Sequence, residues 1–498
     1  MNVMMLLEMA AQGFGDRVAF TNGDDSLTYQ ELYDAAGAAA AEIRQSGCDY
    51  VAMLDVTSLA MPVALFACAW AGVPYVPINY RLTPHEIKAL LERVEPCLLI
   101  TEADRARDFS GHENVQVCTR EDFLSRARSG EILAQPWSMD QEDTGVLLFT
   151  SGTTGAPKAA VLRQKHLVSY ILGSVEFMSA TEEEASLGCV PPYHIAGISA
   201  VLSSVYSGRR VVQLANFTAG DWIALVNREK VTNAFVVPTM LARIVDSLGD
   251  DPSASLPSLR ALAYGGGKMP LAVIERAMQL LPNADFTNAY GLTETSSTIA
   301  VLGPQDHRDA AASEDQAVRR RLVSVGRPLP GVEVEIRDDE GRTLAAGERG
   351  EIYVRGEQVS GEYVGKGSLL DAEGWFPTRD AGSLDAEGFL FLEGRADDVI
   401  VRGGENMSPG EIEDVLLEHG AVSDVAVVGV PDEQWGEAVA AAVVVKTGQS
   451  VVAEELQNWV KERMRSSRVP QLVQFWDELP YNETGKLLRR TVKARLSA

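Results

Sequence analysis

The segment that most constrains this chain is a short apolar run that leads straight into a loop of glycine and hydroxyl residues. Residues 146–149 read VLLF, which is typical of a buried strand, and the sequence TSGTTGAPK follows, ending at Lys158. Glycine lets backbone amides approach a ligand, threonine and serine add hydroxyl donors, and lysine adds a positive charge. This pattern predicts a loop that binds a polyphosphate at the end of a strand.

The loop differs from the common P-loop, which requires G-x-x-x-x-G-K-[ST]. Pro157 precedes the lysine where that pattern has glycine, and Ala159 follows it where the pattern has a hydroxyl that binds magnesium. A flexible surface loop is the alternative interpretation, because glycine, serine and threonine are common in such loops. The rest of the chain has to decide between the two.

Helix and strand patterns alternate through most of the 498 residues, a length that suggests about three domain-sized units. Such alternation predicts a parallel sheet covered by helices. From residue 326, short alternating strands predict a small antiparallel β unit, and residues 399–498 predict a separate α+β unit. Helices are expected at residues 31–46, 84–94, 164–178, 409–419 and 453–464, and strands at 50–54, 97–101, 210–214, 234–238, 261–264, 422–430 and 438–446.

Composition excludes several classes of protein. The net charge of −26 argues against nucleic acid and anionic membranes as partners, so any phosphate site has to be built locally. Five scattered cysteines predict buried free thiols in a reducing cytoplasm. Residues 61–76 are apolar but shorter than the roughly 20 residues of a membrane span, so we expect a core helix and no integral membrane segment. The N-terminus lacks the basic start of a secretory signal.

Further segments suggest parts of a nucleotide site. Three glycines at 265–267 follow a predicted strand and would let a purine lie against the backbone. In NAYGLTET, Tyr290 is suited to stack on a base, Thr293 to bind a phosphate oxygen and Glu294 to hold Mg²⁺, although a capped turn into a helix is the alternative. Asp380, expected at a loop end, is suited to accept hydrogen bonds from a ribose diol.

Two residues are ambiguous when they are taken alone. His194 follows a Pro-Pro turn, and such a histidine is more often structural than catalytic. Lys486 follows a glycine in a polar loop, where it is either a catalytic cation or an ordinary surface lysine.

The motifs together resemble one family over nearly the whole chain. They are, in order, FTSGTTGAPK, PPYHIAG, NAYGLTET, GERGEIYVRG, GWFPTRD, GRADDVIVRGGENMSPGEIE and LPYNETGKLLRR. This order resembles the adenylate-forming superfamily, and most of all its acyl-CoA and aryl-CoA ligases. The resemblance implies an α/β fold with a large N-terminal domain of two βαβαβ subdomains plus a β-barrel (residues 1–396, barrel at about 326–396). A smaller mobile α+β C-terminal domain (397–498) would follow, with its hinge at Asp397.

The resemblance also implies the reaction. A carboxylic acid and ATP, with Mg²⁺, would give an acyl-AMP and pyrophosphate, and coenzyme A would then take the acyl group. Lys486 would contact the substrate carboxylate and the α-phosphate, where it would stabilise the negative charge of the transition state. Thr293 would contact the α-phosphate, Glu294 would hold the metal, and His194 would be a gate that positions the carboxylate. Such an enzyme would serve lipid or secondary metabolism as a monomer or homodimer.

Binding roles follow from the same resemblance. The phosphates would contact Thr150, Ser151, Gly152, Thr153, Thr154, Gly155 and Lys158. Adenosine would contact Gly265, Gly266, Gly267, Asn288, Ala289, Tyr290, Gly291, Asp380 and Arg395. The coenzyme A tunnel would include Gly403, Gly404 and Glu405. The acid would lie among Tyr193, Ile195, Ala196, Gly197, Val237, Pro238, Thr239 and Ser296. One departure concerns Arg379, because family members usually carry glycine there.

The acid and its acceptor stay open at this point. Residues 234–240 (AFVVPTM) offer no carboxylate for a substrate ammonium, which argues against amino-acid activation, and the small or apolar pocket residues predict a hydrophobic acid with a long chain or a bulky ring. The insertion within the N-terminal domain that distinguishes fatty acyl-AMP ligases is not apparent, which favours coenzyme A over a carrier protein. A non-catalytic ATP-binding module is the alternative from another class, and Lys486, Glu294 and Asp397 argue against it.

Overall fold

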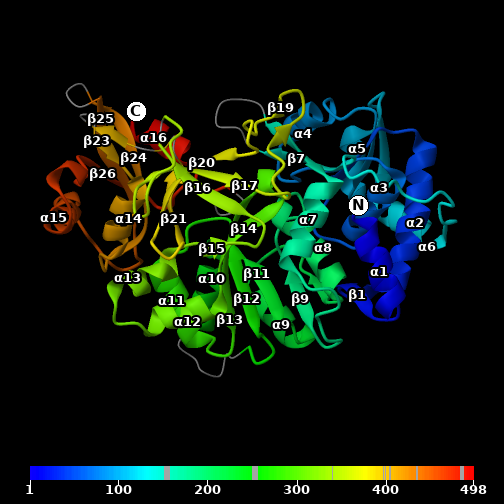
Figure 1. The fold of residues 1–498 in the computed structure, drawn as a ribbon, viewed down its shortest axis with the longest axis horizontal. Helices are drawn as coiled ribbons and strands as arrows, with labels where there is room; N and C mark the ends of the chain where they lie inside the picture. Colours follow the sequence, from blue (N-terminus) through cyan, green and yellow to red (C-terminus); the bar gives the residue numbers. More distant parts are fainter. Residues whose placement is uncertain are drawn as a thin grey trace.

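The computed structural model describes residues 1–150, 157–249, 256–338, 340–395, 398, 400–402, 405–432, 436–482 and 487–497. Their strands form four sheets. In Figure 1 the N-terminal elements lie on the right, the sheet that contains residues 261–302 lies in the middle and the C-terminal elements lie on the left.

The first large sheet has eight strands in the order β19-β18-β8-β7-β4-β3-β5-β6. Its centre is parallel and buried on both faces, which explains apolar strands such as β5. Helix α3 is buried along its whole length, which confirms the predicted core helix. The elements are β3 (Tyr50–Leu54), β4 (Tyr75–Pro77), β5 (Cys97–Thr101), β6 (Val115–Thr119), β7 (Thr144–Thr150), β8 (Lys158–Arg163), β18 (Glu362–Tyr363) and β19 (Gly367–Ser368), with helices α2 (Tyr29–Ser46), α3 (Ala60–Ala71), α4 (Pro84–Leu91), α5 (Ala103–Phe109) and α6 (Arg120–Ser129).

The second large sheet has nine strands in the order β15-β14-β13-β12-β11-β9-β10-β1-β2. Strands β9 to β13 are parallel and alternate with helices, so the two predicted βαβαβ subdomains are both present. The strands are β1 (Val18–Asn22), β2 (Asp25–Thr28), β9 (Ala185–Gly188), β10 (Arg210–Gln213), β11 (Asn233–Val236), β12 (Ala261–Gly265), β13 (Asp285–Leu292), β14 (Ser297–Leu302) and β15 (Arg327–Pro328). The helices are α1 (Met4–Phe14), α7 (Gln164–Ser174), α8 (Ile195–Ser207), α9 (Ala219–Glu229), α10 (Pro238–Leu248), α11 (Leu271–Leu280) and α12 (Pro304–Ala312).

Two local expectations were wrong. The helix predicted over 164–178 ends at Ser174, because Val175 takes an extended backbone with φ −132°. Asp380 was expected at a loop end, but it lies inside a nine-residue strand that pairs with a neighbour on each side.

That strand belongs to the small antiparallel sheet predicted from residue 326. The described strands follow the order β16-β17-β20-β21 and pack a core of Ile336, Ile352, Val354 and Leu390. They are β16 (Glu333–Arg337), β17 (Gly350–Arg355), β20 (Phe376–Leu384) and β21 (Leu390–Arg395).

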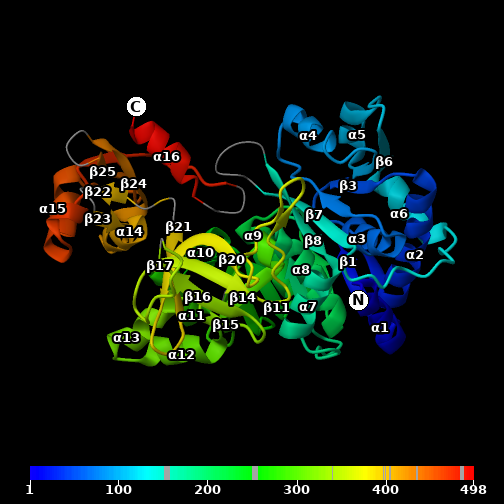
Figure 2. The same cartoon turned by 45° about the horizontal axis from the view of Figure 1, so that its top comes forward.

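The C-terminal residues form the α+β unit predicted from the sequence. Figure 2 shows it at one end of the molecule, beside the small antiparallel sheet. Its long strands β24 and β25 carry apolar clusters on both faces. The elements are β22 (Ile400–Arg402), β23 (Glu405–Met407), β24 (Val422–Asp432), β25 (Gly436–Val445), β26 (Leu472–Phe475), α14 (Pro409–Leu417), α15 (Ala453–Arg463) and α16 (Arg489–Leu496). The predicted boundary at residues 396 and 397 lies outside the described residues.

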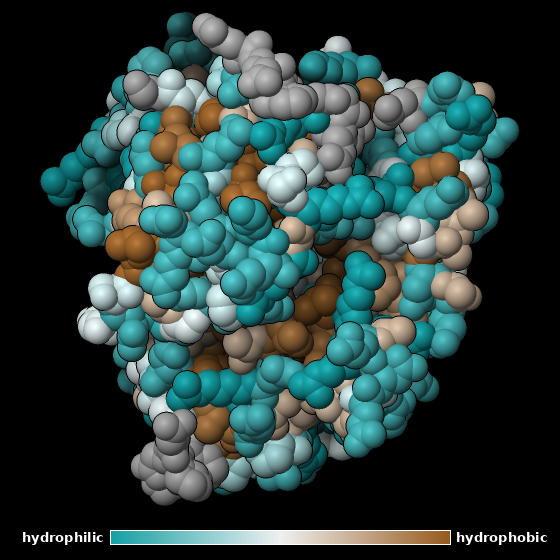
Figure 3. All heavy atoms as spheres, turned by 90° about the vertical axis from the view of Figure 1, so that its left-hand side faces the viewer, coloured by the Kyte–Doolittle hydropathy of each residue, from teal (hydrophilic) through white to brown (hydrophobic). Residues whose placement is uncertain are grey.

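Burial matches the expectations from composition. All five cysteines are free and buried, and burial raises the pKa of Cys97 and of Cys189 to about 12. Within the described ranges, every helix is too short or too polar to cross a membrane. Figure 3, which views the molecule from the side of the C-terminal unit, shows a mostly hydrophilic face with hydrophobic residues in hollows, as expected for a chain with a net charge of −26.

Candidate active site

Motifs that lie far apart in the sequence line one cavity of about 600 Å³. Strands β7 and β8 contribute Thr150 and Lys158, and the turn after β13 contributes Thr293 and Glu294. Strand β20 contributes Thr378 and Arg379, and Asn482 comes from the C-terminal tail. With His194 of the PPYHIAG motif, the tertiary structure therefore brings five of the predicted motifs to a single place.

The predicted phosphate end of this cavity contains Lys158, Tyr363 and Glu294. The Lys158 Nζ atom lies 5.5 Å from the centre of the Tyr363 ring. The Tyr363 hydroxyl donates a hydrogen bond to the Glu294 carboxylate. Because β7 and β8 pair side by side, Lys158 starts its strand directly opposite Thr150. The loop residues between them, Ser151, Gly152, Thr153, Thr154 and Gly155, lie outside the described residues.

The turn that carries Glu294 is fixed from two sides. Residues Thr293–Thr295 form a single 3₁₀ turn, in which the Thr295 hydroxyl accepts a hydrogen bond from the Leu292 amide at 2.9 Å. The Glu294 carbonyl accepts the Ser360 amide at 2.8 Å. The capped turn suggested by the sequence is therefore present, and it holds Glu294 at the cavity rather than excluding a functional role.

The electrostatics of the cavity oppose those of the whole chain. Among the described residues that line it, Glu294 is the only carboxylate, whereas Lys158, Arg209 and Arg379 are cations. The chain as a whole carries −26. Such a local excess of positive charge favours an anionic substrate in a protein whose overall field repels it.

Strand β13 divides the NAYGLTET residues between its two faces, because neighbouring side chains of a strand point in opposite directions. Thr287, Ala289 and Gly291 line the cavity, whereas Asn288 and Tyr290 point to the other face. The Tyr290 hydroxyl donates a 2.7 Å hydrogen bond to Asp380 Oδ2. The predicted base-stacking and ribose residues thus lie together beside the cavity.

Asn288 has a structural contact instead. Its side chain is 6% exposed and donates a 2.9 Å hydrogen bond to the Ser324 carbonyl. Gly265 is also needed for packing, since a Cβ there would lie 2.1 Å from the Ala289 carbonyl oxygen. Gly266 lines the cavity with φ +80°, whereas Gly267 is not among the lining residues.

Half of the residues predicted for the acid pocket line the cavity. Tyr193, Ile195, Ala196 and Val237 line the cavity together with His194. The other four predicted residues are not among the lining residues: Gly197, Pro238, Thr239 and Ser296. Gly197 packs on the Pro-Pro turn, where a Cβ would lie 3.0 Å from the Pro191 carbonyl oxygen, and Ser296 is fully buried with φ +57°.

His194 combines burial with an unused polar atom. Its Nε2 atom is buried and has no hydrogen-bond partner, and its ring lies 4.5 Å from the Tyr193 ring between centroids. Burial, with a smaller effect of Arg81, lowers the pKa of His194 to about 4. The imidazole is therefore neutral at pH 7. Its Nε2 atom lacks the hydrogen-bond partner that buried polar atoms usually have, so it can bind a ligand in the cavity.

The comparison with protein families agrees with this geometry. The model described as AMP-binding enzyme matches residues 7–364, and the model of the AMP-binding enzyme C-terminal domain matches residues 411–486. The chain belongs to the AMP-binding enzyme family. This confirms the predicted adenylate-forming superfamily and its two-part fold, and it places the chain with the acyl-CoA and aryl-CoA synthetases.

Relatives of this AMP-binding enzyme cover nearly its whole length. A 2-succinylbenzoate–CoA ligase from Bacillus licheniformis is 33% identical over 491 residues, which is 97% of this chain and 98% of the relative. The fatty acid–acyl-carrier-protein ligase ScoC from Streptomyces coeruleorubidus is 32% identical, with 94% of this chain and 92% of the relative covered. The o-succinylbenzoate CoA synthetase from Bacillus subtilis, solved with its acyl-adenylate intermediate, has a TM-score of 0.84 at 31% identity and covers 98% of this chain and 97% of its own. That synthetase has also been solved with ATP and a magnesium ion.

Several lining residues of this AMP-binding enzyme were missed by sequence reasoning. They lie on the strands of the second sheet and on the helix that covers it: Ser186, Ser199, Ala200, Ser203, Asn233, Phe235, Ala263 and Thr287, with Arg209 after the helix. The signal in the sequence is weak, because small or polar residues at alternate strand positions are also common on exposed strands.

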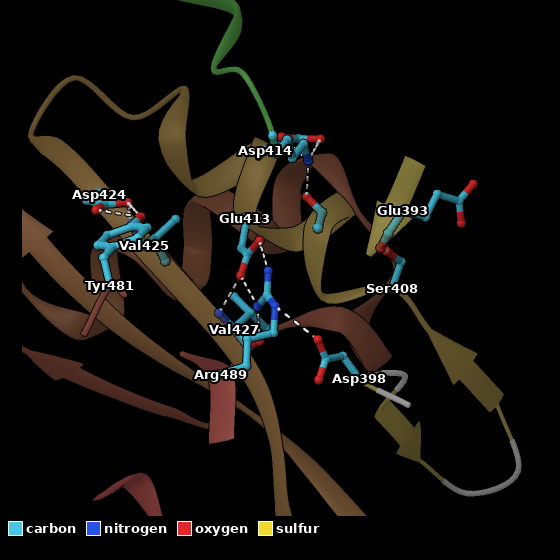
Figure 4. Close-up of polar contacts among 12 residues, drawn as sticks. Glu393, Asp398, Ser408, Glu413, Asp414, Asp424, Val425, Val427, Tyr481 and Arg489 are labelled. Carbon is cyan, nitrogen blue, oxygen red and sulfur yellow. Dashed lines mark hydrogen bonds and ion pairs between the residues drawn. The ribbon is translucent and has the colours of Figure 1, made fainter. Parts of the chain in front are cut away.

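The C-terminal tail of the enzyme is held by a partly buried arginine (Figure 4). Arg489, the first residue of α16, donates to both carboxylate oxygens of Glu413 on α14, with the second bond at 2.7 Å, and to the Val427 carbonyl on β24 at 2.8 Å. Its Nε atom lies 3.6 Å from Asp398 Oδ2. Arg489 therefore joins the tail to a helix, a strand and the segment around residue 398.

The remaining predicted residues of the C-terminal unit stay untested. Lys486, Asp397, Gly403 and Gly404 lie outside the described residues, as do the side chains of Arg395 and Glu405. The backbone of Arg395 is described, and it pairs with Asp380 across β20 and β21.

Proposed function

We propose that this enzyme condenses a carboxylic acid with ATP to give an acyl-AMP and pyrophosphate, and then transfers the acyl group to the thiol of coenzyme A. The observation that carries the proposal is the meeting of Lys158, Thr293, Glu294 and His194 around one cavity. The family membership and the synthetase relatives support it. We propose further that the reaction takes place in the cytoplasm, in lipid or secondary metabolism, by a monomer or homodimer.

The phosphate end would be held by this chain's own donors. Lys158 and the Thr150 hydroxyl lie on adjacent strands at the mouth of the predicted phosphate loop. Glu294 suits a magnesium ion, because carboxylates are the ligands this cation prefers and no other carboxylate lines the described part of the cavity. When bound there, magnesium would supply charge neutralisation for the departing pyrophosphate.

The acid end would be organised by His194. A neutral imidazole offers its Nε2 atom to the substrate carboxyl group without adding a formal charge, and the low pKa keeps it neutral over the working pH range. We propose that Lys486 supplies the charge instead, between the carboxylate and the α-phosphate. Asn482, four positions before Lys486, lines the cavity, which supports this placement of the tail.

The second step needs another arrangement of the C-terminal unit. We propose that residues 397–498 rotate about Asp397 after adenylation, which withdraws Lys486 and brings Gly403, Gly404 and Glu405 to the pantetheine path. Polar contacts join the two parts in the described residues, such as the ion pair of Lys268 with Asp414 and the 2.8 Å hydrogen bond from the Ser408 hydroxyl to the Glu393 carbonyl. Polar interfaces between domains are compatible with relative movement.

The experiment that tests the proposal measures pyrophosphate release with ATP and Mg²⁺ against a panel of acids, from acetate through fatty acids to aryl and polycyclic acids. Each acid is assayed with and without coenzyme A. We expect one class with a hydrophobic body to release pyrophosphate, and coenzyme A to be consumed. No release with any acid, together with no binding of ATP, would contradict the proposal.

Lys486→Ala separates the two half-reactions. We expect acyl-AMP formation to fall by about 100-fold or more, since a positioned charge in the transition state has effects of that order. Thioester formation from supplied acyl-AMP should largely survive. Equal loss in both half-reactions would remove the proposed role of Lys486, and Lys493→Gln serves as a control because Lys493 lies on the surface of α16 in an ion pair with Glu437.

A carrier protein is the second candidate acceptor. The relative ScoC is named as a fatty acid–acyl-carrier-protein ligase and covers 94% of this chain at 32% identity. If pyrophosphate is released but coenzyme A is not consumed, a phosphopantetheine carrier protein should be acylated in its place.

A further inference from the structure

The cavity continues far beyond the nucleotide end as a slot between helix α8 and the second sheet. The alternating burial of the strands shows which residues face it. Along β11, β12 and β13, half-buried positions alternate with fully buried ones. The half-buried positions, Asn233, Phe235, Ala261, Ala263, Thr287 and Ala289, line the cavity together with the buried Ala234, and buried residues such as Leu262 and Phe286 pack into the core.

Strand register arranges these residues in rows across the sheet. Ser186 pairs with Asn233, which pairs with Ala261, at the amino ends of the strands. Phe235, Ala263 and Thr287 form the next row. Gly265 and Ala289 pair at the carboxyl ends, next to the nucleotide side. From Ala261 to Gly265 the slot follows four residues of strand, or about 13 Å at about 3.3 Å per residue.

Helix α8 leaves the slot open because, after Ile195 at its first position, it presents only small side chains to it. Ala196, Ser199, Ala200, Ser203 and Ser204 all line the cavity. Their spacing of three or four residues places them on one face of the helix. A helix that covers a sheet usually carries large apolar residues on this face, and those would fill the space.

The two ends of the slot differ in chemistry. At the nucleotide end, the buried His194 Nε2 atom has no partner. The middle is apolar, with Phe235, Ala200 and Ala263. The far end has polar groups, namely the Asn233 amide, the Arg209 guanidinium and the Ser203 hydroxyl, which donates to the Ala200 carbonyl at 3.3 Å.

An ion pair and backbone hydrogen bonds hold the far end in place. Arg209 Nε and Nη2 bind Glu184 Oε2 at 3.1 and 3.0 Å, and both side chains are about one-fifth exposed. The Tyr29 hydroxyl donates to the carbonyls of Arg209 and Ser204 at 3.0 and 3.2 Å, which fixes the backbone on both sides. Because Glu184 balances the charge of Arg209, the end offers hydrogen bonds without a net charge.

We propose that the acid substrate is an extended molecule with an apolar body and a hydrogen-bond acceptor about 13 Å from its carboxylate. The carboxylate would lie at His194 and the acceptor, a carbonyl or hydroxyl oxygen, would lie among Ser203, Asn233 and Arg209. This inference rests on the proposed function, since it assumes that the acid enters the same cavity as ATP. It narrows the predicted hydrophobic acid to one with a polar far end.

The test uses the full-length enzyme and pyrophosphate release from matched acids. One series runs from butyrate to palmitate with a methyl end, and a second carries a terminal hydroxyl or oxo group at the same lengths. We expect kcat/KM to rise with length up to the span of the slot, and the polar-ended acid of that length to exceed its methyl-ended partner by about tenfold, the effect of one hydrogen bond of 1.4 kcal/mol. No preference for either length or end group would overturn the proposal.

Two variants of one residue separate space from polarity. Ser203→Phe fills the slot, so the ratio of kcat/KM for long over short acids should fall by about tenfold or more. Ser203→Ala keeps the space and should remove only the preference for the polar end. As a control, Leu172→Phe adds a ring on the exposed side of α7 and should leave both ratios unchanged. Should Ser203→Phe fail to fold, Ser203→Val tests the same point with less volume.

These outcomes are distinct from failure of the proposed function. If wild-type enzyme releases pyrophosphate with some acid, but Ser203→Phe leaves the length ratio as in wild type, the slot does not hold the acid while the ligase activity stands. If wild type releases none with any acid, the proposed function fails first.

Discussion

Arg379 has a backbone conformation that glycine adopts more easily. It stands where family members usually carry glycine, and its φ of +60° lies in the left-handed region. Two side chains stabilise this geometry: Glu351 Oε1 on the neighbouring strand accepts the Arg379 amide at 3.1 Å, and the Thr378 hydroxyl on the same strand accepts the Asp380 amide at 3.1 Å. The question raised by the sequence is thereby answered. The backbone has the left-handed conformation that glycine favours, and the Arg379 side chain lines the cavity.

Arg379→Gly should therefore stabilise the enzyme. A side chain in the left-handed region destabilises the folded state by about 1–2 kcal/mol, and glycine removes this strain. Because glycine also gives the unfolded chain more conformational entropy, we expect a net increase of about 1 kcal/mol in the free energy of unfolding. The urea midpoint measures it. Arg379→Ala is the matched control, because it removes the same guanidinium but keeps the strained backbone. Equal stability of the two variants would contradict the explanation.

At the scale of elements, the packing of α14, β24 and α16 depends on one charged group. Glu413 is 7% exposed and accepts the Val427 amide at 2.8 Å in addition to the bonds from Arg489. Helix α16 is thus joined through a single guanidinium to α14 and β24, which lie about sixty or more residues earlier in the chain. A buried carboxylate without its partner has a large desolvation cost.

Arg489→Leu should loosen these elements. We expect a loss of about 3–5 kcal/mol, the usual cost of leaving one member of a buried ion pair alone. Hydrogen exchange on the intact enzyme, read at the amides of α14 and α16, measures the loss where it occurs. Lys493→Gln, which removes a half-exposed ion pair from the same helix, should change stability by about 1 kcal/mol or less. Similar effects of both substitutions would show that the Arg489 network contributes no more to the free energy of unfolding than an exposed ion pair does.

At the scale of the whole molecule, an exposed ion pair links the N-terminal part to the C-terminal unit. Lys268 Nζ lies 2.7 Å from Asp414 Oδ1 and 3.3 Å from the Gly410 carbonyl, and the two side chains are 44% and 55% exposed. An exposed pair contributes about 0–1 kcal/mol. That is little for the stability of the fold, but it is enough to shift an equilibrium between two orientations of a mobile unit.

Lys268→Gln should therefore change the balance of the two half-reactions and leave the melting temperature unchanged. We expect the rate of thioester formation from supplied acyl-AMP, relative to adenylation, to rise by up to about fivefold, as about 1 kcal/mol allows. Added salt should reduce the difference from wild type, because it screens exposed charges. Lys165→Gln breaks a comparable pair with Glu142 inside the N-terminal part and serves as the control. The same change in both variants would contradict a role of Lys268 in domain orientation.

The sequence alone was sufficient for the fold class and the family. Alternating helix and strand patterns predicted a helix-covered parallel sheet, a small antiparallel unit and a C-terminal α+β unit, because these signals are local and repeat within each element. The family resemblance added the second parallel subdomain and the role of His194, whereas Lys158, Thr293 and Glu294 stood out by residue type, and the structure places all four residues around one cavity.

Only the tertiary structure decided which residues face that cavity. Asn288 and Ala289 are neighbours in one motif, yet they point to opposite faces of β13. Ser203 and Asn233 are thirty residues apart and carry no motif, yet both line the cavity. A motif specifies residue types along the chain, whereas a pocket is formed by strand register, by the face that a helix presents and by side chains too small to fill the space, and these depend on contacts between distant segments.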